Sequence, residues 1–134
     1  MEPLERIRAI DEAYGDKALQ LAGTLPHGDQ RKLELGMILA PDPEVLMLDE
    51  PTAGMASEQV PELMQLVQSI QDAGGKTVIL VEHNMNVVMS VSDRITVMHQ
   101  GGLLAEGTPD EISADERVQT AYLGELYKDQ EGEA

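Results

Sequence analysis

Two acidic residues follow an apolar segment near the middle of the chain. Val45-Leu46-Met47-Leu48 is a short unbroken aliphatic run, typical of a strand covered on both faces, and Asp49-Glu50 ends it. In a parallel sheet this ending places both carboxylates at the carboxyl edge, where α/β folds bind ligands. There an Asp can hold hydrated Mg²⁺, and the adjacent Glu can orient or deprotonate a water molecule. The alternative is an ordinary acidic turn.

A histidine ends the next apolar segment. Residues 77–81 predict a second buried strand, and Glu82-His83 follows it. We expect the His83 side chain to lie along the same edge as Asp49 and Glu50, where an imidazole can bind a phosphate oxygen and sense its presence. A single His at a strand end is often structural, so the hypothesis depends on its combination with the acidic pair.

A third segment, residues 25–31, predicts a tight turn at the start of a helix. Exposed backbone N–H groups and the helix dipole attract anions at such a position. Gly28 would let a phosphate approach the backbone closely. The alternative is an ordinary capped loop.

The elements that must position these residues follow from periodicity and turn chemistry. Loose helical spacing at Leu4, Ile7 and Ile10 breaks near residues 14–16, and the polar end from Lys128 is expected to fray. A capping box at 108–111 opens a helix that runs toward Tyr122. Further helices are expected over residues 29–40, 61–73 and 84–92, strands over 45–48, 77–81 and 95–98, and a hairpin through 103–105.

This alternation predicts a parallel α/β sheet of three strands plus a hairpin. Such a sheet is thin and needs cover on both faces, which hints at further strands upstream of residue 1.

Composition limits the classes of partner. The 25 acids and 9 bases give a net charge of −16, which repels nucleic acid and anionic lipid. The absence of Cys excludes a disulfide framework and a thiolate metal site. No apolar run approaches the roughly 20 residues that cross a bilayer, so we expect a soluble chain. The acidity fits either an ordinary acidic protein or one from a salt-adapted proteome.

In this order and spacing, the segments from about residue 21 to 123 resemble the second half of the nucleotide-binding domain of ABC transporters. The resemblance implies a P-loop NTPase-like fold, of which this chain holds the C-terminal part. It implies that Asp49 handles Mg²⁺, that Glu50 is the general base for ATP hydrolysis, and that His83 contacts the γ-phosphate.

Two further segments match motifs of that family. The D-loop falls on Ala53, Gly54, Met55 and Ala56. The signature motif, which touches the ATP held by the opposite subunit, falls on the segment after Leu25, namely Pro26, His27, Gly28, Asp29 and Gln30. The resemblance divides the chain into the end of a helical subdomain (1–40), part of the ATPase core (41–126) and a tail (127–134).

A finer resemblance, in segments such as Val81-Glu82-His83-Asn84-Met85 and Ala121-Tyr122-Leu123-Gly124-Glu125, is to the ATP-binding subunits of importers for branched-chain amino acids or urea. It implies a second ATP-binding subunit and membrane permeases as partners, with a solute-binding protein involved indirectly and no nucleic acid. The permeases would dock mainly on the region before Leu25. The place implied is cytoplasmic, on the inner face of the cell membrane.

Three residues depart from the family pattern. Pro26 stands where signatures have Ser and loses a hydroxyl that donates to phosphate. Asp29 replaces Gln and brings a negative charge near the nucleotide, which weakens binding unless it is turned away or neutralised. Ala56 replaces the usual Asp or Asn and loses a polar contact across the dimer.

The printed sequence contains no G-x-x-x-x-G-K-S/T loop, and Gly74-Gly75-Lys76-Thr77 lacks its spacing. We therefore predict that this chain alone does not bind ATP with useful affinity and is inactive as a fragment. The alternative is a non-catalytic module that pairs with a full-length ATPase and donates its signature segment.

Overall fold

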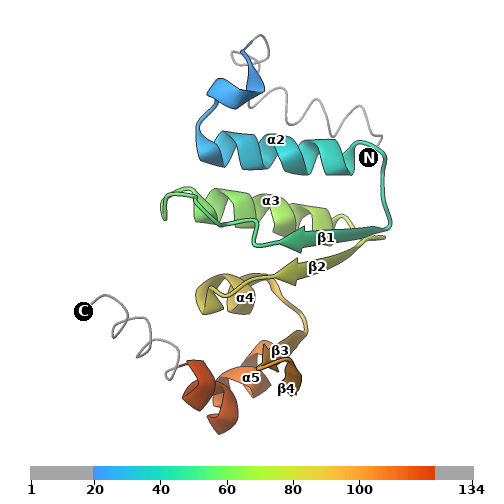
Figure 1. Cartoon of the computed structure of the whole chain (residues 1–134). Helices are drawn as coiled ribbons and strands as arrows, with labels where there is room; N and C mark the ends of the chain where they lie inside the picture. The colour runs from blue at the N-terminus through green and yellow to red at the C-terminus, as the bar shows by residue number, and fades with distance from the viewer. Residues whose placement is uncertain (1–19, 123–134) are drawn as a thin grey trace, which may run out of the picture. The chain divides into compact units, whose positions relative to one another are not determined.

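The computed structural model describes residues 20–122. The chain forms two compact units, Met1–Asn84 and Met85–Ala134, and each is described by itself (Figure 1). The predicted elements before residue 20, the tail from Lys128 and the end of the segment at 121–125 lie outside the described residues. Among residues 20–122, none of the helices combines the length and hydropathy that a bilayer crossing requires.

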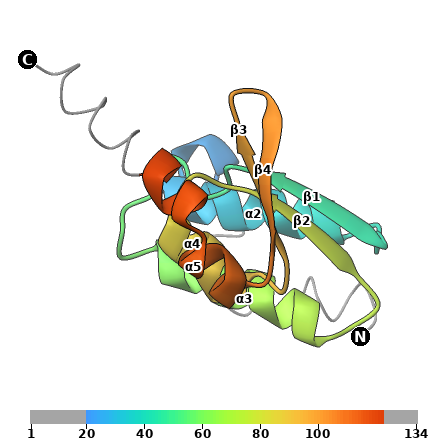
Figure 2. The ribbon, with the colours of Figure 1, turned by 90° about the horizontal axis from the view of Figure 1, so that it is seen from below.

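The first unit has helices and strands in alternation. Its elements are η2 (Ala22–Thr24), α2 (His27–Leu39), β1 (Val45–Asp49), α3 (Val60–Asp72) and β2 (Thr77–Val81). β1 and β2 pair in parallel, with Val45 opposite Thr77 and Asp49 opposite Val81, and they lie side by side in Figures 1 and 2. The predicted parallel α/β arrangement is therefore confirmed for this pair. α2 begins two residues earlier than expected, because Pro26 suits the position just before a first helical turn.

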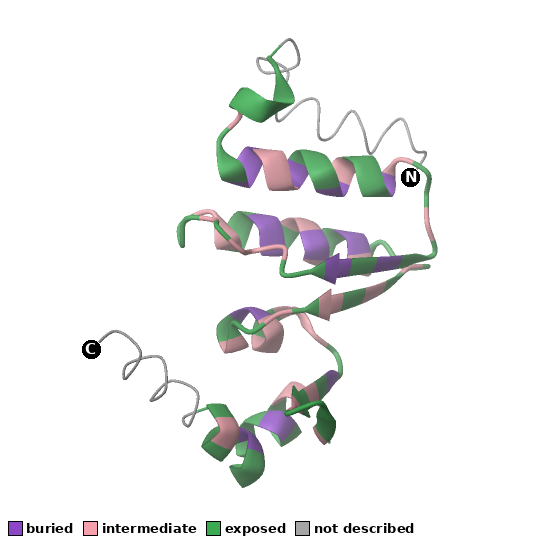
Figure 3. Ribbon diagram, in the orientation of Figure 1, coloured by how far each residue is buried: buried purple, intermediate pink, exposed green. Residues whose placement is uncertain are grey.

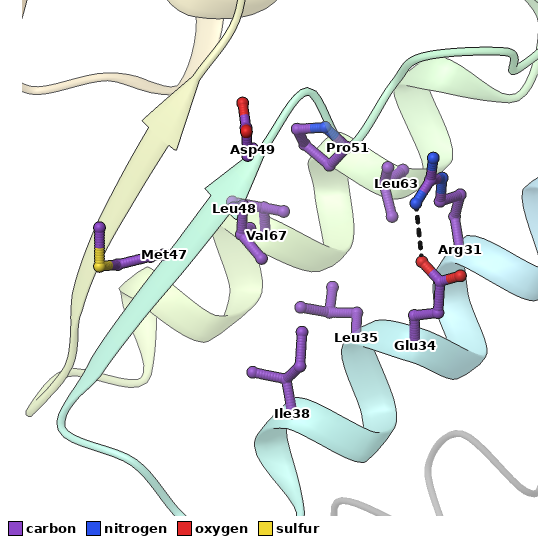
Figure 4. A pocket seen from close by; sticks show the side chains of 10 residues that line it. All are labelled: Arg31, Glu34, Leu35, Ile38, Met47, Leu48, Asp49, Pro51, Leu63 and Val67. Atoms are coloured by element: carbon purple, nitrogen blue, oxygen red, sulfur yellow. Dashed lines mark hydrogen bonds and ion pairs between the residues drawn. The ribbon is translucent and has the colours of Figure 1, made fainter.

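The interior of the first unit is aliphatic. In Figure 4 the side chains of Leu35, Leu48, Leu63 and Val67 converge on one space between α2, β1 and α3. The buried apolar residues of these three elements are Leu35, Leu39, Leu46, Leu48, Leu63, Met64, Val67 and Ile70. This interior fixes the strand whose end carries Asp49 and Glu50.

The expectation that both strands are covered on both faces is wrong for the described residues. Leu46 and Leu48 are buried, whereas Met47 is 72% exposed and Ile79 is 44% exposed. Figure 3 shows this alternation along β1. α2 and α3 cover the face of β1 that carries Leu46 and Leu48, and within this unit Met47 on the other face stays exposed.

The second unit is built around a hairpin. Its elements are α4 (Met85–Val91), β3 (Ile95–His99), β4 (Gly102–Gly107) and α5 (Pro109–Ala114), followed by helical residues 116–122. β3 and β4 are antiparallel, and the turn between them places Gln100 and Gly101 at φ 49° and 78°. Ile95, Ala105, Ile112 and Val118 form its core.

The capping box predicted at the start of α5 is present. The Thr108 side chain accepts from the Glu111 N–H at 3.3 Å, and Glu111 Oε2 accepts from the Thr108 N–H at 2.8 Å. The helix does not continue unbroken to Tyr122 as expected, because Asp115 is extended (φ −76°, ψ 113°) and its carboxylate accepts from the Arg117 N–H at 2.9 Å.

The single sheet of three parallel strands plus a hairpin is also not what the structure has. Within residues 20–122 there are two sheets of two strands each, β1 with β2 and β3 with β4. β3 therefore takes its ladder hydrogen bonds from β4.

Candidate functional site

The backbone at the end of β1 holds Glu50 in an uncommon conformation. The Glu50 N–H donates to the Val81 carbonyl at 2.8 Å, which extends the β1–β2 ladder by one bond. At φ 45° Glu50 is in the left-handed region, which a non-glycine residue adopts at a cost of roughly 1–3 kcal/mol. Such a conformation persists only where the surroundings fix it, and here the neighbouring strand contributes.

Glu50 and His83 meet at the carboxyl edge of the two parallel strands. His83 Nδ1 lies 3.4 Å from Glu50 Oε1, and the side chains are 78% and 51% exposed. The pair forms because Glu50 directly follows β1, His83 follows β2 after Glu82, and the two strands are neighbours in register. The proximity predicted from the sequence is present in the structure, and the catalytic roles of the two residues stay predictions.

Asp49 is the last residue of β1 and is exposed. Figure 4 shows its carboxylate at the strand end, directed away from the apolar side chains that line the space beneath it. Residues 20–122 contain no cluster of three or more His, Asp or Glu side chains able to hold a metal. Mg²⁺ is commonly held by only one or two carboxylates together with waters and substrate phosphates, and the metal role of Asp49 stays a prediction.

Sequence reasoning missed two residues beside this pair. Glu82 Oε1 accepts hydrogen bonds from the Thr52 hydroxyl at 2.6 Å and from the Thr52 N–H at 3.1 Å. The contact joins the loop after Glu50 to the residue before His83. An acid next to His83 and a hydroxyl two residues after Glu50 were the only sequence signals, and their pairing depends on the strand register.

The segment at the start of α2 is held by its own side chains and by α3. Gln30 Nε2 donates to the Leu25 carbonyl at 2.8 Å, which closes the turn around Pro26. A Cβ added to Gly28 would lie 2.6 Å from Oε1 of Gln59, the residue before α3. Gly28 therefore makes room for a side chain of the same unit, a role that the sequence did not reveal.

Asp29, the unexpected acid of this segment, is turned inward. Its side chain is only 10% exposed, and its Oδ1 lies 4.0 Å from Nζ of Lys32, which is itself 7% exposed. Lys32 Nζ also lies 2.5 Å from Glu62 Oε1 in the first turn of α3. The charge of Asp29 is therefore both turned away and balanced, which are the two conditions under which it would not repel a nucleotide.

The loop between β1 and α3 contacts the start of α2. A Cβ added to Gly54 would lie 3.5 Å from Nε2 of His27, and Gly54 has a φ of 74°. Turns close the loop, with the Ala53 N–H donating to the Glu50 carbonyl at 3.0 Å and the Gln59 N–H to the Ala56 carbonyl at 2.9 Å. The described residues thus bring two predicted segments together at His27 and Gly54.

Comparisons with known proteins agree with this arrangement. The chain is 43% identical over 122 residues to the high-affinity branched-chain amino acid transport ATP-binding protein LivG of Salmonella typhimurium, covering 91% of this chain and 46% of that protein. It is 45% identical over 104 residues to BraF of Pseudomonas aeruginosa, a protein of the same description, covering 78% and 41%. The ADP conformation of an ATP-binding cassette of an ABC transporter superposes with a TM-score of 0.75 at 27% identity, covering 91% and 50%.

The fold is the C-terminal part of an ABC-type ATPase domain. A sequence profile described as branched-chain amino acid ATP-binding cassette transporter also matches residues 103–127.

The chain spans slightly less than half the length of these two ABC-type relatives. The two relatives are ATP-binding proteins, and the solved cassette is in its ADP conformation.

Proposed function

We propose that this chain supplies the hydrolytic edge and the signature segment of the ATP site in the ATP-binding subunit of an ABC importer for branched-chain amino acids. The observation that carries the proposal is the 3.4 Å contact between His83 and Glu50 at the carboxyl ends of two paired parallel strands. The phosphate loop, for which the printed sequence has no motif, would come from another stretch of polypeptide. The related urea importers remain the alternative for the transported solute.

In this proposal Glu50 and His83 divide the chemistry of hydrolysis. Glu50 orients a water molecule and takes its proton as the water oxygen attacks the γ-phosphorus, and the bond from that phosphorus to the ADP oxygen breaks. His83 donates a hydrogen bond to a γ-phosphate oxygen and so reports whether the phosphate is present. Mg²⁺, held through Asp49, would neutralise phosphate charge when bound.

The exposure of this edge supports a partner subunit. A Glu–His contact that is 51% and 78% exposed is a weak interaction in water, since exposed ion pairs contribute about 0–1 kcal/mol. Excluding water strengthens electrostatic stabilisation of a transition state. A second ATP-binding subunit covering this edge would therefore activate it, while the start of α2 would meet the nucleotide of that subunit. Permeases, and a place on the inner face of the membrane, complete the proposal.

A chimera tests the hydrolytic role. The aligned C-terminal portion of the LivG protein would be replaced by this chain, and the purified importer would be assayed for ATP hydrolysis and for leucine uptake. We expect activity, and we expect Glu50→Gln to lower kcat on the order of 10²–10⁴-fold with ATP binding retained. Glu58→Gln, an exposed acid in the loop before α3, is the matched control. An active chimera that tolerates Glu50→Gln would contradict the proposal.

The isolated chain tests the need for a second stretch of polypeptide. Without an amide cradle and a Lys for the β- and γ-phosphates, we expect no heat of binding when the chain is titrated with Mg-ATP in a calorimeter. Micromolar binding by the chain alone would show that the phosphates have a site within these residues.

A further inference from the structure

A carboxylate that hydrolysis does not use lies beside the proposed catalytic pair. Glu82 immediately precedes His83, and its Oε1 accepts from both the hydroxyl (2.6 Å) and the N–H (3.1 Å) of Thr52. Thr52 is two residues after Glu50. A single oxygen atom thus connects the two segments whose ends carry Glu50 and His83.

The connection matters because the residue that precedes this loop, Glu50, has a strained backbone. Glu50 has a positive φ of 45°, and on its strand side it is held by the bond from its N–H to Val81. On its loop side, the Glu50 carbonyl accepts from Ala53, which belongs to the same loop and moves with it. The Thr52–Glu82 bonds tie this loop to the end of the neighbouring strand, and a strained residue keeps its conformation only where its surroundings fix it.

Among the described residues, the Glu82 carboxylate makes its hydrogen bonds to Thr52. Its second oxygen, Oε2, is buried and has no hydrogen-bond partner within the described part of the chain. The hydrogen bonds of this carboxylate therefore concentrate on Thr52, with the shorter one made by the hydroxyl. Removing that hydroxyl would leave a partly buried carboxylate with one backbone donor, which is unfavourable enough to move the loop or the acid.

We propose that Glu82 is a positioning residue that, through Thr52, holds Glu50 within reach of His83. The structural part concerns only the geometry of this chain. The consequence for catalysis rests on the proposed function, and the two parts are tested by separate measurements.

The geometry is tested by NMR of the full 134-residue chain. The ring resonances of His83 are assigned, and the change that Glu50→Gln causes in them serves as the measure of contact between the two side chains. The same change is then measured in Thr52→Val and Glu82→Met, which remove the hydroxyl or the acceptor at similar size. The conservative partners are Thr52→Ser and Glu82→Gln, which retain a hydroxyl and an acceptor oxygen.

We expect the response of His83 to Glu50→Gln to be largely lost in Thr52→Val and Glu82→Met and kept in Thr52→Ser and Glu82→Gln. Urea unfolding of each variant identifies any that is not folded, and the conservative pair then decides the result. An undiminished response in the folded Thr52→Val and Glu82→Met variants overturns the proposal, as does a response lost equally in the conservative pair.

The catalytic consequence is read in the LivG chimera. There Thr52→Val and Glu82→Met should lower kcat on the order of 10–100-fold with the KM for ATP unchanged, because the general base is displaced and the nucleotide contacts are not. If Glu50→Gln leaves the chimera active, the proposed function fails while the NMR result still stands. If kcat depends on Glu50 but not on Glu82 or Thr52, only the positioning role fails.

Discussion

Lys32 links the start of α2 to the first turn of α3. Its ammonium, almost entirely buried, lies 2.5 Å from Glu62 and 4.0 Å from Asp29, and it joins the first turn of α3 to the start of α2. The apolar stem of a lysine packs like a hydrocarbon, so methionine is a close substitute for everything except the charge.

We predict that Lys32→Met lowers the free energy of unfolding by about 3 kcal/mol, because it removes a buried positive charge that lies beside the carboxylates of Asp29 and Glu62. Asp29→Asn in the same chain should restore part of that loss. Urea unfolding followed by circular dichroism measures both. Glu34→Gln, which removes the partner of Arg31 in an exposed pair, is the control and should change stability by less than about 1 kcal/mol. Strict additivity of the Lys32 and Asp29 effects would mean that the two residues do not interact.

For single residues, the sequence predicted contacts between residues at neighbouring strand ends. It missed contacts that depend on how the helices pack. Glu50 and His83 could be placed together because Glu50 directly follows β1 and His83 follows β2 after Glu82, and parallel neighbours end at one edge. The partners of Gly28 and Lys32 could not be foreseen, because Gln59 and Glu62 approach them only through the packing of α3 beside α2. Glu82 and Thr52 were missed for the same reason.

Among the elements, β1 shows how far an apolar run can mislead. Four consecutive aliphatic residues suggested burial on both faces, yet Leu46 is 1% exposed and the adjacent Met47 is 72% exposed. An unbroken aliphatic run indicates only that neither face of the strand carries polar side chains. Which face is covered depends on which helices the sheet meets, and that information lies outside the run.

Neighbouring residues on β1 therefore give a matched test. Leu46→Ala should lower the free energy of unfolding by about 3 kcal/mol, since it opens a cavity in the interior shared by α2, β1 and α3. Met47→Ala should cost less than about 0.5 kcal/mol, because most of its side chain is already in water. Equal losses in urea unfolding would show that the second face is buried in solution.

The break between α5 and residues 116–122 is an element boundary with a pH dependence. The hydrogen bond from the Arg117 side chain lowers the pKa of Asp115 to about 2 from its ordinary 3.8. Because the folded pKa is the lower one, the ionised carboxylate stabilises this boundary above pH 3.8, and that contribution is lost as the pH falls toward 2.

We predict that the Asp115 carboxyl carbon titrates with a midpoint near 2 in NMR spectra, and that the amide of Arg117 loses protection over the same range. Asp115→Asn, which can still accept a hydrogen bond from the helix start, should remove the pH dependence of that amide. A midpoint close to 3.8 would mean that the Arg117 contact is absent in solution.

For the whole molecule, the sequence predicted the fold class correctly but not which strands pair. Alternating strands and helices correctly indicated a parallel α/β arrangement, and the motif spacing indicated an ABC-type ATPase. The expectation of one continuous sheet was wrong because strand order along a chain does not state which strands pair. β3 finds its partner in β4 through a turn with two positive φ angles, which is a local pairing.

The large net charge of the whole chain affects its stability in solution. With 25 acids against 9 bases, the folded chain concentrates a charge of −16, and mutual repulsion favours expansion. Salt shortens the range of that repulsion, from about 10 Å at 0.1 M to about 3 Å at 1 M. The compact state should gain more than the unfolded chain, in which the acids are farther apart.

We therefore predict that the free energy of unfolding rises steadily between 0.1 M and 1 M KCl, a range over which the screening length falls from about 10 Å to about 3 Å. Urea unfolding at each concentration measures it. Neutralising two exposed acids with Glu58→Gln and Glu116→Gln should raise stability at low salt and weaken the response to KCl, because less repulsion remains to be screened. A rise of equal size in that variant would point to a general effect of the salt on apolar burial. A fall in stability with KCl would mean that specific ion pairs, such as Lys32 with Glu62, outweigh the excess of like charge.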